Sequence, residues 1–205
     1  MFPRTPRTWQ RTLYIVFFAQ LMSSTGFSLI FPFLPLYVQS LGTTTGISIE
    51  FWVGMAFSSQ AITMMLASPV WGALADQYGR KVMVERAMFG GAVLLFFMAF
   101  VNSAEQLVLL RTIQGFITGT VSANNALVAA SAPRERMGYA MGMLQVGLWS
   151  GISLGPLVGG VMADAFGYAL PHIFTAVFLA LGGFLIHFGV EEHFEPAIDR
   201  QKGRY

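Results

Sequence analysis

The sequence predicts an all-α integral membrane protein built from six membrane-spanning helices. Hydrophobic residues make up 55% of its 205 residues and charged residues only 11%, whereas about 25% of the residues in soluble domains are charged. Six apolar runs alternate with short polar segments. Each run has the length of about 18 residues or more that indicates a membrane helix. Basic residues gather in every second loop, as membrane topology requires.

Composition also excludes several classes of function. The net charge is only +2, and no basic patch is interleaved with aromatic residues, so we expect no nucleic-acid partner. The absence of cysteine excludes disulfides, thiolate zinc sites and cysteine catalysis, and we expect no metal or cofactor. The first apolar run is longer than a signal-peptide core and lacks a small-residue cleavage site, so we expect it to be retained as a helix.

The chain divides into a six-helix unit, residues 1–190, and a charged tail, residues 191–205. The apolar runs predict spans at residues 13–38, 51–73, 82–101, 107–130, 138–163 and 172–190.

The basic residues predict the orientation of these spans. Six crossings place eleven of the twelve Lys and Arg residues on the side of both termini, the exception being Arg111 within the fourth span. The opposite loops, residues 39–50, 102–106 and 164–171, contain no Lys or Arg. By the positive-inside rule, we expect both termini to be cytoplasmic.

The second and third spans are joined by a polar hinge with the sequence Gly72-Ala-Leu-Ala-Asp76-Gln-Tyr-Gly79-Arg80-Lys81. Gly72 permits close approach of helix backbones, and Gly79 supplies a turn between antiparallel helices. Asp76 and Arg80 are placed to pair with each other or with a neighbouring helix end.

The end of the fifth span repeats this pattern as Gly160-Val-Met-Ala-Asp164-Ala-Phe-Gly167. The two segments would cross the membrane in opposite directions, which indicates an inverted repeat of three plus three helices. The alternative is a chance similarity between two glycine-rich helix ends.

The first span ends in Pro32-Phe-Leu-Pro35 and carries a polar and aromatic face. Two prolines remove two helical hydrogen bonds and bend the outer end, as a moving gate or an ordinary kink. Helical spacing places on one face, as a candidate cavity wall, Gln20, Ser23, Ser24, Phe27 and Phe31. The serine hydroxyls have an alternative role, because they can bond backbone carbonyls of their own helix.

The fourth span carries the intramembrane charge Arg111, which is costly enough to suggest a function. The residues that continue its face at helical spacing are Gln114, Gly115, Thr118, Ser122 and Asn125. The alternative is that Arg111 extends toward the outer interface or Glu105.

The fifth span contains glycines and a proline at regular spacing: Gly142, Gly151, Gly155, Pro156, Gly159 and Gly160. Glycines at four-residue steps form a groove that accepts another helix, and the proline adds a bend. Any tightly packed helix pair favours small residues as well.

Together these motifs resemble the major facilitator superfamily of secondary transporters. The hinge matches the superfamily loop pattern G-x-L-[AS]-D-x-[FY]-G-R-[RK] at every defined position, and Arg111-Thr-Ile-Gln114-Gly115 matches R-x-x-Q-G. The proline pattern of the first span and the glycine spacing of the fifth are similar to those of twelve-span drug/proton antiporters.

The resemblance implies the N-terminal half of a proton-coupled drug efflux carrier that works by alternating access in a bacterial inner membrane. Its implied partners are the lipid bilayer, a C-terminal six-helix half (covalent or separate), a small lipophilic substrate and protons. It implies a cytoplasmic latch in which Asp76 meets a helix end of the other half, while Arg80 and Lys81 bridge to inner loops. It also implies that Arg111 serves proton coupling or shapes the cavity.

The sequence departs from the family in one place, and other functions stay open. The inner end of the fourth span has no acid to pair with Arg80, which leaves Glu135 as the local candidate. His172 and His187 lie near opposite ends of the sixth span, where packed or interfacial roles are expected. The coupling site is therefore expected elsewhere.

Alternative functions are a non-transporting scaffold or regulatory half and a facilitator for another small solute. No residue pattern supports a membrane enzyme.

Overall fold

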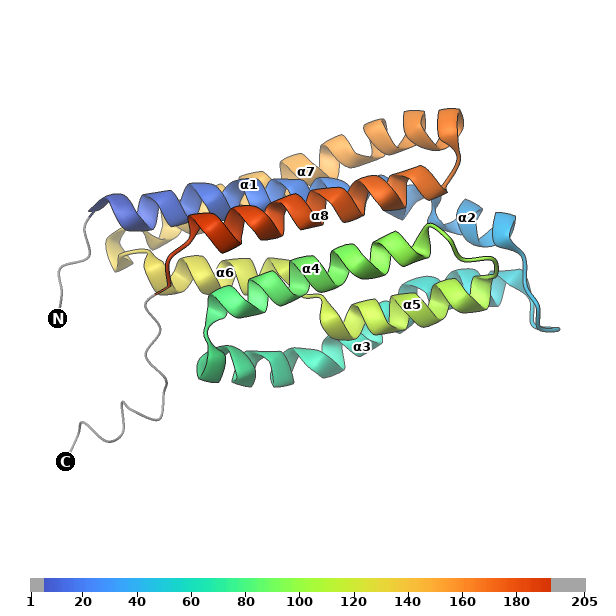
Figure 1. Ribbon diagram of the computed structural model, residues 1–205, viewed down its shortest axis with the longest axis horizontal. Coiled ribbons are helices and arrows are strands. Elements are labelled where there is room, and N and C mark those ends of the chain that lie inside the picture. Colours follow the sequence, from blue (N-terminus) through green and yellow to red (C-terminus); the bar gives the residue numbers. More distant parts are fainter. Residues whose placement is uncertain (1–5, 193–205) are drawn as a thin grey trace.

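The computed structural model describes residues 6–192, and every regular element within that range is a helix (Figure 1). Arg4 and most of the predicted tail, residues 193–205, lie outside this range. The α-helices are α1 Pro6–Ile30, α2 Leu34–Leu41, α3 Ile49–Tyr78, α4 Arg80–Met98, α5 Ala104–Ile117, α6 Thr120–Ser131, α7 Met137–Phe166 and α8 Ala169–Gly189. Two 3₁₀ turns, η1 Phe31–Phe33 and η2 Arg134–Arg136, precede α2 and α7.

Serine caps define where two of these helices begin. The hydroxyl of Ser48 accepts the N–H of Phe51 at 3.4 Å at the start of α3, and Ser103 accepts the N–H of Gln106 at 3.4 Å in α5. Each helix also carries a glutamate in its first turn, where the positive end of the helix dipole favours an acid.

Four helical stretches of the described chain are long and apolar enough to cross a membrane: Trp9–Leu41, Ile49–Tyr78, Arg134–Phe166 and Ala169–Gly189. They correspond to the first, second, fifth and sixth predicted spans. The third corresponds to α4, whose first two turns carry four charged residues. The fourth is divided between α5 and α6, of 14 and 12 residues.

The prediction of one continuous helix over residues 107–130 was wrong. Thr118 ends α5 by donating both its N–H and its hydroxyl to the carbonyl of Gln114, at 2.8 and 2.7 Å. Gly119 then adopts φ 138° and ψ 35°, a conformation that residues with a side chain rarely take. Because the backbone leaves the helical path here, α6 begins with a new direction.

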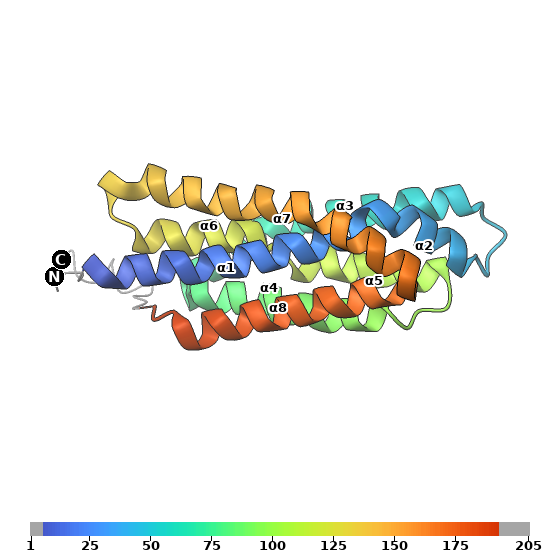
Figure 2. The ribbon, with the colours of Figure 1, turned by 90° about the horizontal axis from the view of Figure 1, so that it is seen from above.

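The helices pack into an elongated bundle with their axes along its length (Figure 2). α1 packs against α7 and α8, α3 packs against α5, and α4 packs against α8, α5 and α6. One apolar cluster lies at the end that holds the α2–α3 loop and includes Leu34, Leu95, Met98, Leu107 and Leu179. A second lies at the end where α1 begins and includes Leu13, Val84, Leu127, Leu144 and Ile186.

The helices α3 and α7 have matching lengths and positions in the chain. α3 runs from Ile49 to Tyr78 and α7 from Met137 to Phe166, so both have 30 residues and are displaced by 88 residues. The same displacement relates η1, at residues 31–33, to the break after Thr118 in the fourth segment. Each half of the bundle therefore has an interrupted helix followed by a long continuous one.

The ends of α3 and α7 also share their geometry. Gly79 and Gly167 have φ of 98° and 79°, and each donates its N–H to the carbonyl four residues earlier, at 3.1 and 2.9 Å. The repeated sequence pattern thus forms the same helix ending at opposite ends of the bundle (Figure 1).

Candidate functional site

The hinge predicted from the sequence comprises the last two turns of α3, which reaches Tyr78 rather than ending at residue 73, together with Gly79 and the first residues of α4. The guanidinium of Arg80 lies 3.8 Å from the carboxylate of Asp76, whose side chain is 68% exposed. An exposed pair of this kind contributes about 0–1 kcal/mol, so Asp76 is held only weakly. The ion pairs of the described residues do not include one between Arg80 and Glu135, the alternative considered above.

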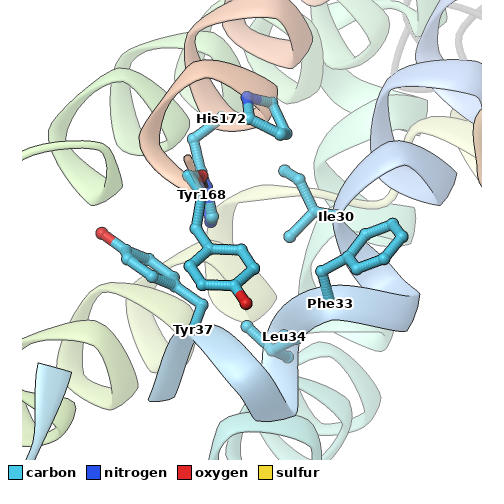
Figure 3. A pocket seen from close by; sticks show the side chains of 7 residues that line it. Ile30, Phe33, Leu34, Tyr37, Tyr168 and His172 are labelled. Carbon is cyan, nitrogen blue, oxygen red and sulfur yellow. Dashed lines mark hydrogen bonds between the residues drawn. The ribbon is translucent and has the colours of Figure 1, made fainter. Parts of the chain in front are cut away.

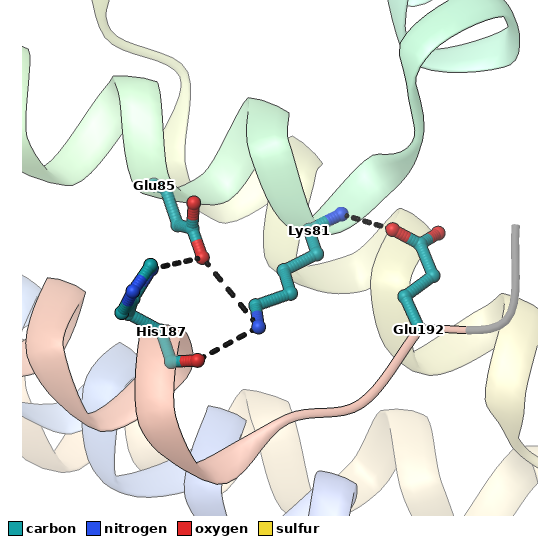
Figure 4. Close-up of polar contacts among 4 residues, drawn as sticks. All are labelled: Lys81, Glu85, His187 and Glu192. Carbon is teal, nitrogen blue, oxygen red and sulfur yellow. Dashed lines mark hydrogen bonds and ion pairs between the residues drawn. The ribbon is translucent and has the colours of Figure 1, made fainter.

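The structure adds Glu192 to this hinge (Figure 4). Its two carboxylate oxygens accept the backbone N–H groups of Arg80 and Lys81, at 3.0 and 2.7 Å, and so cap the N-terminus of α4. The ammonium of Lys81 donates to the carbonyl of His187 at 2.7 Å and lies 3.8 Å from Glu85. The segment after α8 is therefore fastened to the start of α4.

Arg111 is buried between helices rather than extended to the surface. Its side chain is 5% exposed and donates to the amide oxygen of Gln60 on α3. The alternative partner Glu105 instead accepts from Thr43 at 2.5 Å and from two further residues of the α2–α3 loop. These hydrogen bonds, the one from Thr43 foremost, hold the pKa of Glu105 well below its ordinary value.

A second polar contact joins α1, in the first predicted span, to α6, in the fourth. Gln20 on α1 accepts a hydrogen bond from the amide of Asn124 on α6 at 2.5 Å, and both side chains are buried. The hydroxyls of Ser23 and Ser24 return to the carbonyl of Gln20, which confirms the alternative considered for them.

The break before α6 changes which residues share the face of Arg111. Gln114 and Thr118 are buried with it, but Ser122 is exposed and Asn125 is only half-buried. Neither amide atom of Gln114 has a hydrogen-bond partner among the described residues. The continuous polar face expected from helical spacing is therefore wrong beyond Thr118, because Gly119 ends that spacing.

Glycines of α7 bring it into direct contact with α1. A Cβ at Gly151 would lie 2.6 Å from Cβ of Ser24, one at Gly155 would lie 2.4 Å from Cβ of Ser28, and one at Gly159 would lie 2.3 Å from a backbone oxygen. Real Cβ atoms do not approach this closely, so a side chain at any of the three would separate the helices. The hydroxyl of Ser28 also donates to the carbonyl of Ile152 at 2.7 Å.

Other glycines of the motifs make no such contact. A Cβ at Gly72 or Gly142 would meet no described atom within 4 Å, and one at Gly160 would meet only the ring of Phe33 at 3.4 Å. The close helix approach expected at Gly72 and Gly142 is absent within residues 6–192. On α5, by contrast, a Cβ at Gly115 would lie 2.2 Å from a backbone oxygen of α3.

At the proline-containing end of the first span, the backbone changes from α-helix to 3₁₀ geometry at Phe31–Phe33. This turn contains Pro32 and is followed by Pro35. Pro156 lies inside α7, which remains continuous. Phe27 is half-buried and packs against the apolar cluster at this end.

A small cavity lies beside this 3₁₀ turn and is closed by His172 of α8 (Figure 3). Its volume of about 10 Å³ has room for one water, far below what a drug-sized ligand needs. His172 is 2% exposed, its ring lies 4.9 Å from that of Tyr37 at an interplanar angle of 49°, and its Nδ1 bonds the carbonyl of Tyr168 at 2.9 Å. The expectation of a packed histidine is confirmed.

Sequence reasoning missed a contact between α3, α4 and the end of α5. The guanidinium of Arg86 lies 3.5 Å from the centre of the Trp71 ring, and the Trp71 N–H donates to the carbonyl of Phe116 at 2.6 Å. No spacing rule links these three positions, because they lie on different helices.

Glycine-mediated helix contacts and an arginine buried in a helical bundle are features found in membrane transporters. The model of the Major Facilitator Superfamily matches residues 16–204. The chain belongs to this superfamily, whose members are transporters rather than enzymes, and the resemblance drawn from the motifs is confirmed.

Individual proteins refine this assignment. The chain is 40% identical over 189 residues to the multidrug resistance protein MdtG of Proteus mirabilis (strain HI4320), covering 92% of this chain and 47% of that protein. It is 37% identical over 197 residues to MdtG of Escherichia coli O6:K15:H31 (strain 536 / UPEC), covering 96% and 48%. The chain thus spans about half the length of the curated relatives it matches.

The crystal structure of the human organic anion transporter MFSD10 (TETRAN) has the same fold as this chain. The TM-score is 0.73 at 20% sequence identity, covering 90% of this chain and 48% of that protein. At this level of identity the likeness concerns the fold alone.

Proposed function

We propose that this chain is the N-terminal six-helix half of a transporter that exports lipophilic solutes in exchange for protons by alternating access. The observation that carries the proposal is the identity of 37–40% to multidrug resistance relatives over more than nine-tenths of the chain, but about half of each relative. The second six-helix half is its main proposed partner.

The six segments form two inverted triplets in this proposal. The first triplet is α1 with α2, α3 and α4, and the second is α5 with α6, α7 and α8. The common displacement of 88 residues and the shared helix ending at Gly79 and Gly167 support this arrangement. So do the contacts, because α1 packs on α7 as α5 packs on α3. An inverted repeat is common in secondary transporters.

The basic end of the bundle faces the cytoplasm in this proposal, with both termini. Within residues 6–192, all Lys and Arg residues except Arg86 and Arg111 lie at the end where α1 begins (Figure 1). The loops at the other end carry none. The positive-inside rule then assigns the hinge at Gly79 to the cytoplasmic side of a bacterial inner membrane.

In this proposal the buried polar contacts hold together the helices that form one wall of the transport cavity. Gln20–Asn124 and Arg111–Gln60 connect helices of the first, second and fourth predicted spans. Transporters of this type bind substrate near the bilayer midplane between their repeats. The 10 Å³ cavity at His172 is too small for a drug, so the second half would supply the opposite wall.

Proton coupling would depend on a carboxylate of the second half. Arg111 is buried, and its partner Gln60 is neutral. A buried guanidinium is stabilised by an anion, and protonation of a facing carboxylate would remove that anion. Arg111 therefore sets the position at which proton binding changes the contact between the halves.

The hinge would act as the cytoplasmic latch. Asp76 is exposed and weakly paired, so its carboxylate is available to the positive N-terminus of a helix in the second half. Glu192 and Lys81 fasten the segment after α8 to the same hinge, which couples the predicted linker to the latch.

Efflux of ethidium from everted membrane vesicles tests the proposal, with this chain expressed alone and with the C-terminal half of an MdtG relative. Proton-driven ethidium movement only in the paired sample supports it. Its absence in both samples, with both halves inserted, favours a scaffold half instead.

Asp76→Asn should impair transport in the paired sample without changing membrane insertion. Normal turnover would contradict the latch. Gln77→Asn, an exposed change at the neighbouring position, is the matched control.

A further inference from the structure

A second cavity lies between the beginnings of α1 and α7, away from the polar contacts of the proposed transport cavity. Its volume is about 230 Å³, and it is lined by Trp9, Gln10, Leu13, Tyr14, Arg136 and Tyr139. Pockets for drug-sized ligands measure about 300–1,000 Å³, so this one suits a small polar group.

Arg136 supplies the cavity with a positive charge that no described acid neutralises. It ends the η2 turn, is exposed, and takes part in none of the ion pairs within residues 6–192. A guanidinium presents a planar fork of donors that fits two phosphate oxygens at once. The charge and geometry therefore favour a phosphate-bearing anion.

The aromatic walls place the cavity at the level of lipid headgroups. Trp9, Tyr14 and Tyr139 each combine an apolar ring with a polar tip, and such residues collect at the membrane–water interface. Tyr14 of α1 and Tyr139 of α7 both line the cavity, one from each helix. The basic residues at this end of the bundle are also those expected to face headgroups.

Exposed apolar side chains continue beyond the cavity on both helices. Phe18 lies one turn beyond Tyr14 on α1 and is 53% exposed, and Val146 lies two turns beyond Tyr139 on α7 and is 55% exposed. Between them Gly142 is exposed, and a Cβ there would meet nothing within 4 Å. A charged pocket followed by exposed apolar side chains matches the headgroup and the acyl chain of a phospholipid.

We propose that this cavity binds the phosphate headgroup of an anionic phospholipid through Arg136, with an acyl chain along the exposed surface of α7 over Gly142. The inference uses only the membrane location of the superfamily and does not depend on the substrate or direction of transport.

The complete chain, purified in nonionic detergent, tests this by its thermal unfolding midpoint, because a ligand of the folded state raises that midpoint with concentration. The ligands are dihexanoyl phosphatidylglycerol, dihexanoyl phosphatidylcholine and inorganic phosphate. Loss of one charge-assisted contact corresponds to about a tenfold or greater loss of affinity. We expect this loss for phosphatidylglycerol in Arg136→Gln but less than about a twofold change in the matched control Arg134→Gln.

Gly142→Phe tests the acyl-chain position separately, since a ring there should weaken phosphatidylglycerol several-fold. The midpoint without lipid should stay unchanged, because the position is open. Equal affinity in Arg136→Gln and Arg134→Gln would overturn the site. Inorganic phosphate binding as tightly as phosphatidylglycerol would show a free-phosphate site and overturn the lipid assignment.

Discussion

The first and fourth segments are interrupted at equivalent positions but in different ways. In the first, the residues at both ends of the 3₁₀ turn, Ile30 and Phe33, keep right-handed helical dihedrals, so α2 continues the course of α1. In the fourth, Thr118 is extended and Gly119 has φ 138°, so α6 is a separate helix. Prolines remove hydrogen-bond donors and still permit a helical path, whereas this glycine takes the chain off that path.

The two halves of the fourth segment are held by different neighbours. α5 packs on α3, where Thr63 donates to the carbonyl of Thr112 at 2.9 Å and Gly115 permits the close approach. α6 packs on α4 and α1, with Asn124 bonded to Gln20. The first segment, in contrast, lies along α7 over most of its length. The fourth segment is therefore the one whose halves are anchored to different helices.

The largest effect is expected where helices touch through glycine. Gly155→Leu should destabilise the fold by about 3 kcal/mol, because its Cβ would lie 2.4 Å from Cβ of Ser28. Gly115→Leu should act similarly at the α3–α5 contact. Reversible unfolding in mixed detergent micelles measures both. Gly142→Leu, in open space, is the control, and an equal loss there would contradict the contacts as described.

The next largest effect is expected at the hydrogen bond between Gln20 and Asn124, which joins the two interrupted segments. Gln20→Leu or Asn124→Leu alone should cost about 1–3 kcal/mol of unfolding free energy, because each leaves a buried amide without its partner. The double variant should lose less than the sum, giving a coupling of about 1 kcal/mol in a double-mutant cycle. Strict additivity would show that the two side chains do not interact.

At the break between α5 and α6, Gly119→Ala should lower the free energy of unfolding. A side chain at φ 138° is strained, so we predict a loss of about 1–2 kcal/mol in the same unfolding assay. Gly138→Ala, in an open helical position of α7, should instead stabilise by about 0.5–1 kcal/mol. Stabilisation by both substitutions would mean that the fourth segment is a continuous helix.

A smaller effect is expected at the hinge between α3 and α4. Glu192→Gln should lower stability by about 0.3–1 kcal/mol, because it removes a negative charge from the N-terminus of α4. Glu191→Gln makes the same charge change without a bond to that helix end. Equal shifts of the unfolding midpoint would exclude the cap.

The smallest effect is expected at the first interruption. Pro32 is exposed, and its neighbours are already in helical geometry, so Pro32→Ala should change stability by less than about 0.5 kcal/mol. A loss as large as that of Gly119→Ala would erase the distinction between the two interruptions.

Sequence reasoning found the parts of the fold that depend on local pattern. The hydropathy of the apolar runs located the helices, and the repeat of Gly79 and Gly167 located two matching turns. It missed the break at Gly119, because a glycine in an apolar run can serve packing, as Gly115 does, or end a helix. Only the neighbours of each glycine distinguish the two roles.

The polar contacts were harder to predict because their partners lie far apart in the chain. Glu192 caps a helix end more than a hundred residues earlier, and Asn124 rather than Asn125 is buried because the break resets the helical face. Gly142 fits the glycine spacing but touches no other helix. Spacing identifies a common face of one helix and does not specify which helix covers it.

The most direct test of the account uses the absence of cysteine from the chain. Single cysteines at exposed positions, Gln77→Cys in the hinge and Thr44→Cys and Ala165→Cys at the other end of the bundle, are exposed in turn to a membrane-impermeant maleimide in intact cells. Inverted triplets with a cytoplasmic hinge predict labelling at positions 44 and 165, and at position 77 only after permeabilisation. Labelling at position 77 in intact cells, or at only one of the other two, would contradict the account.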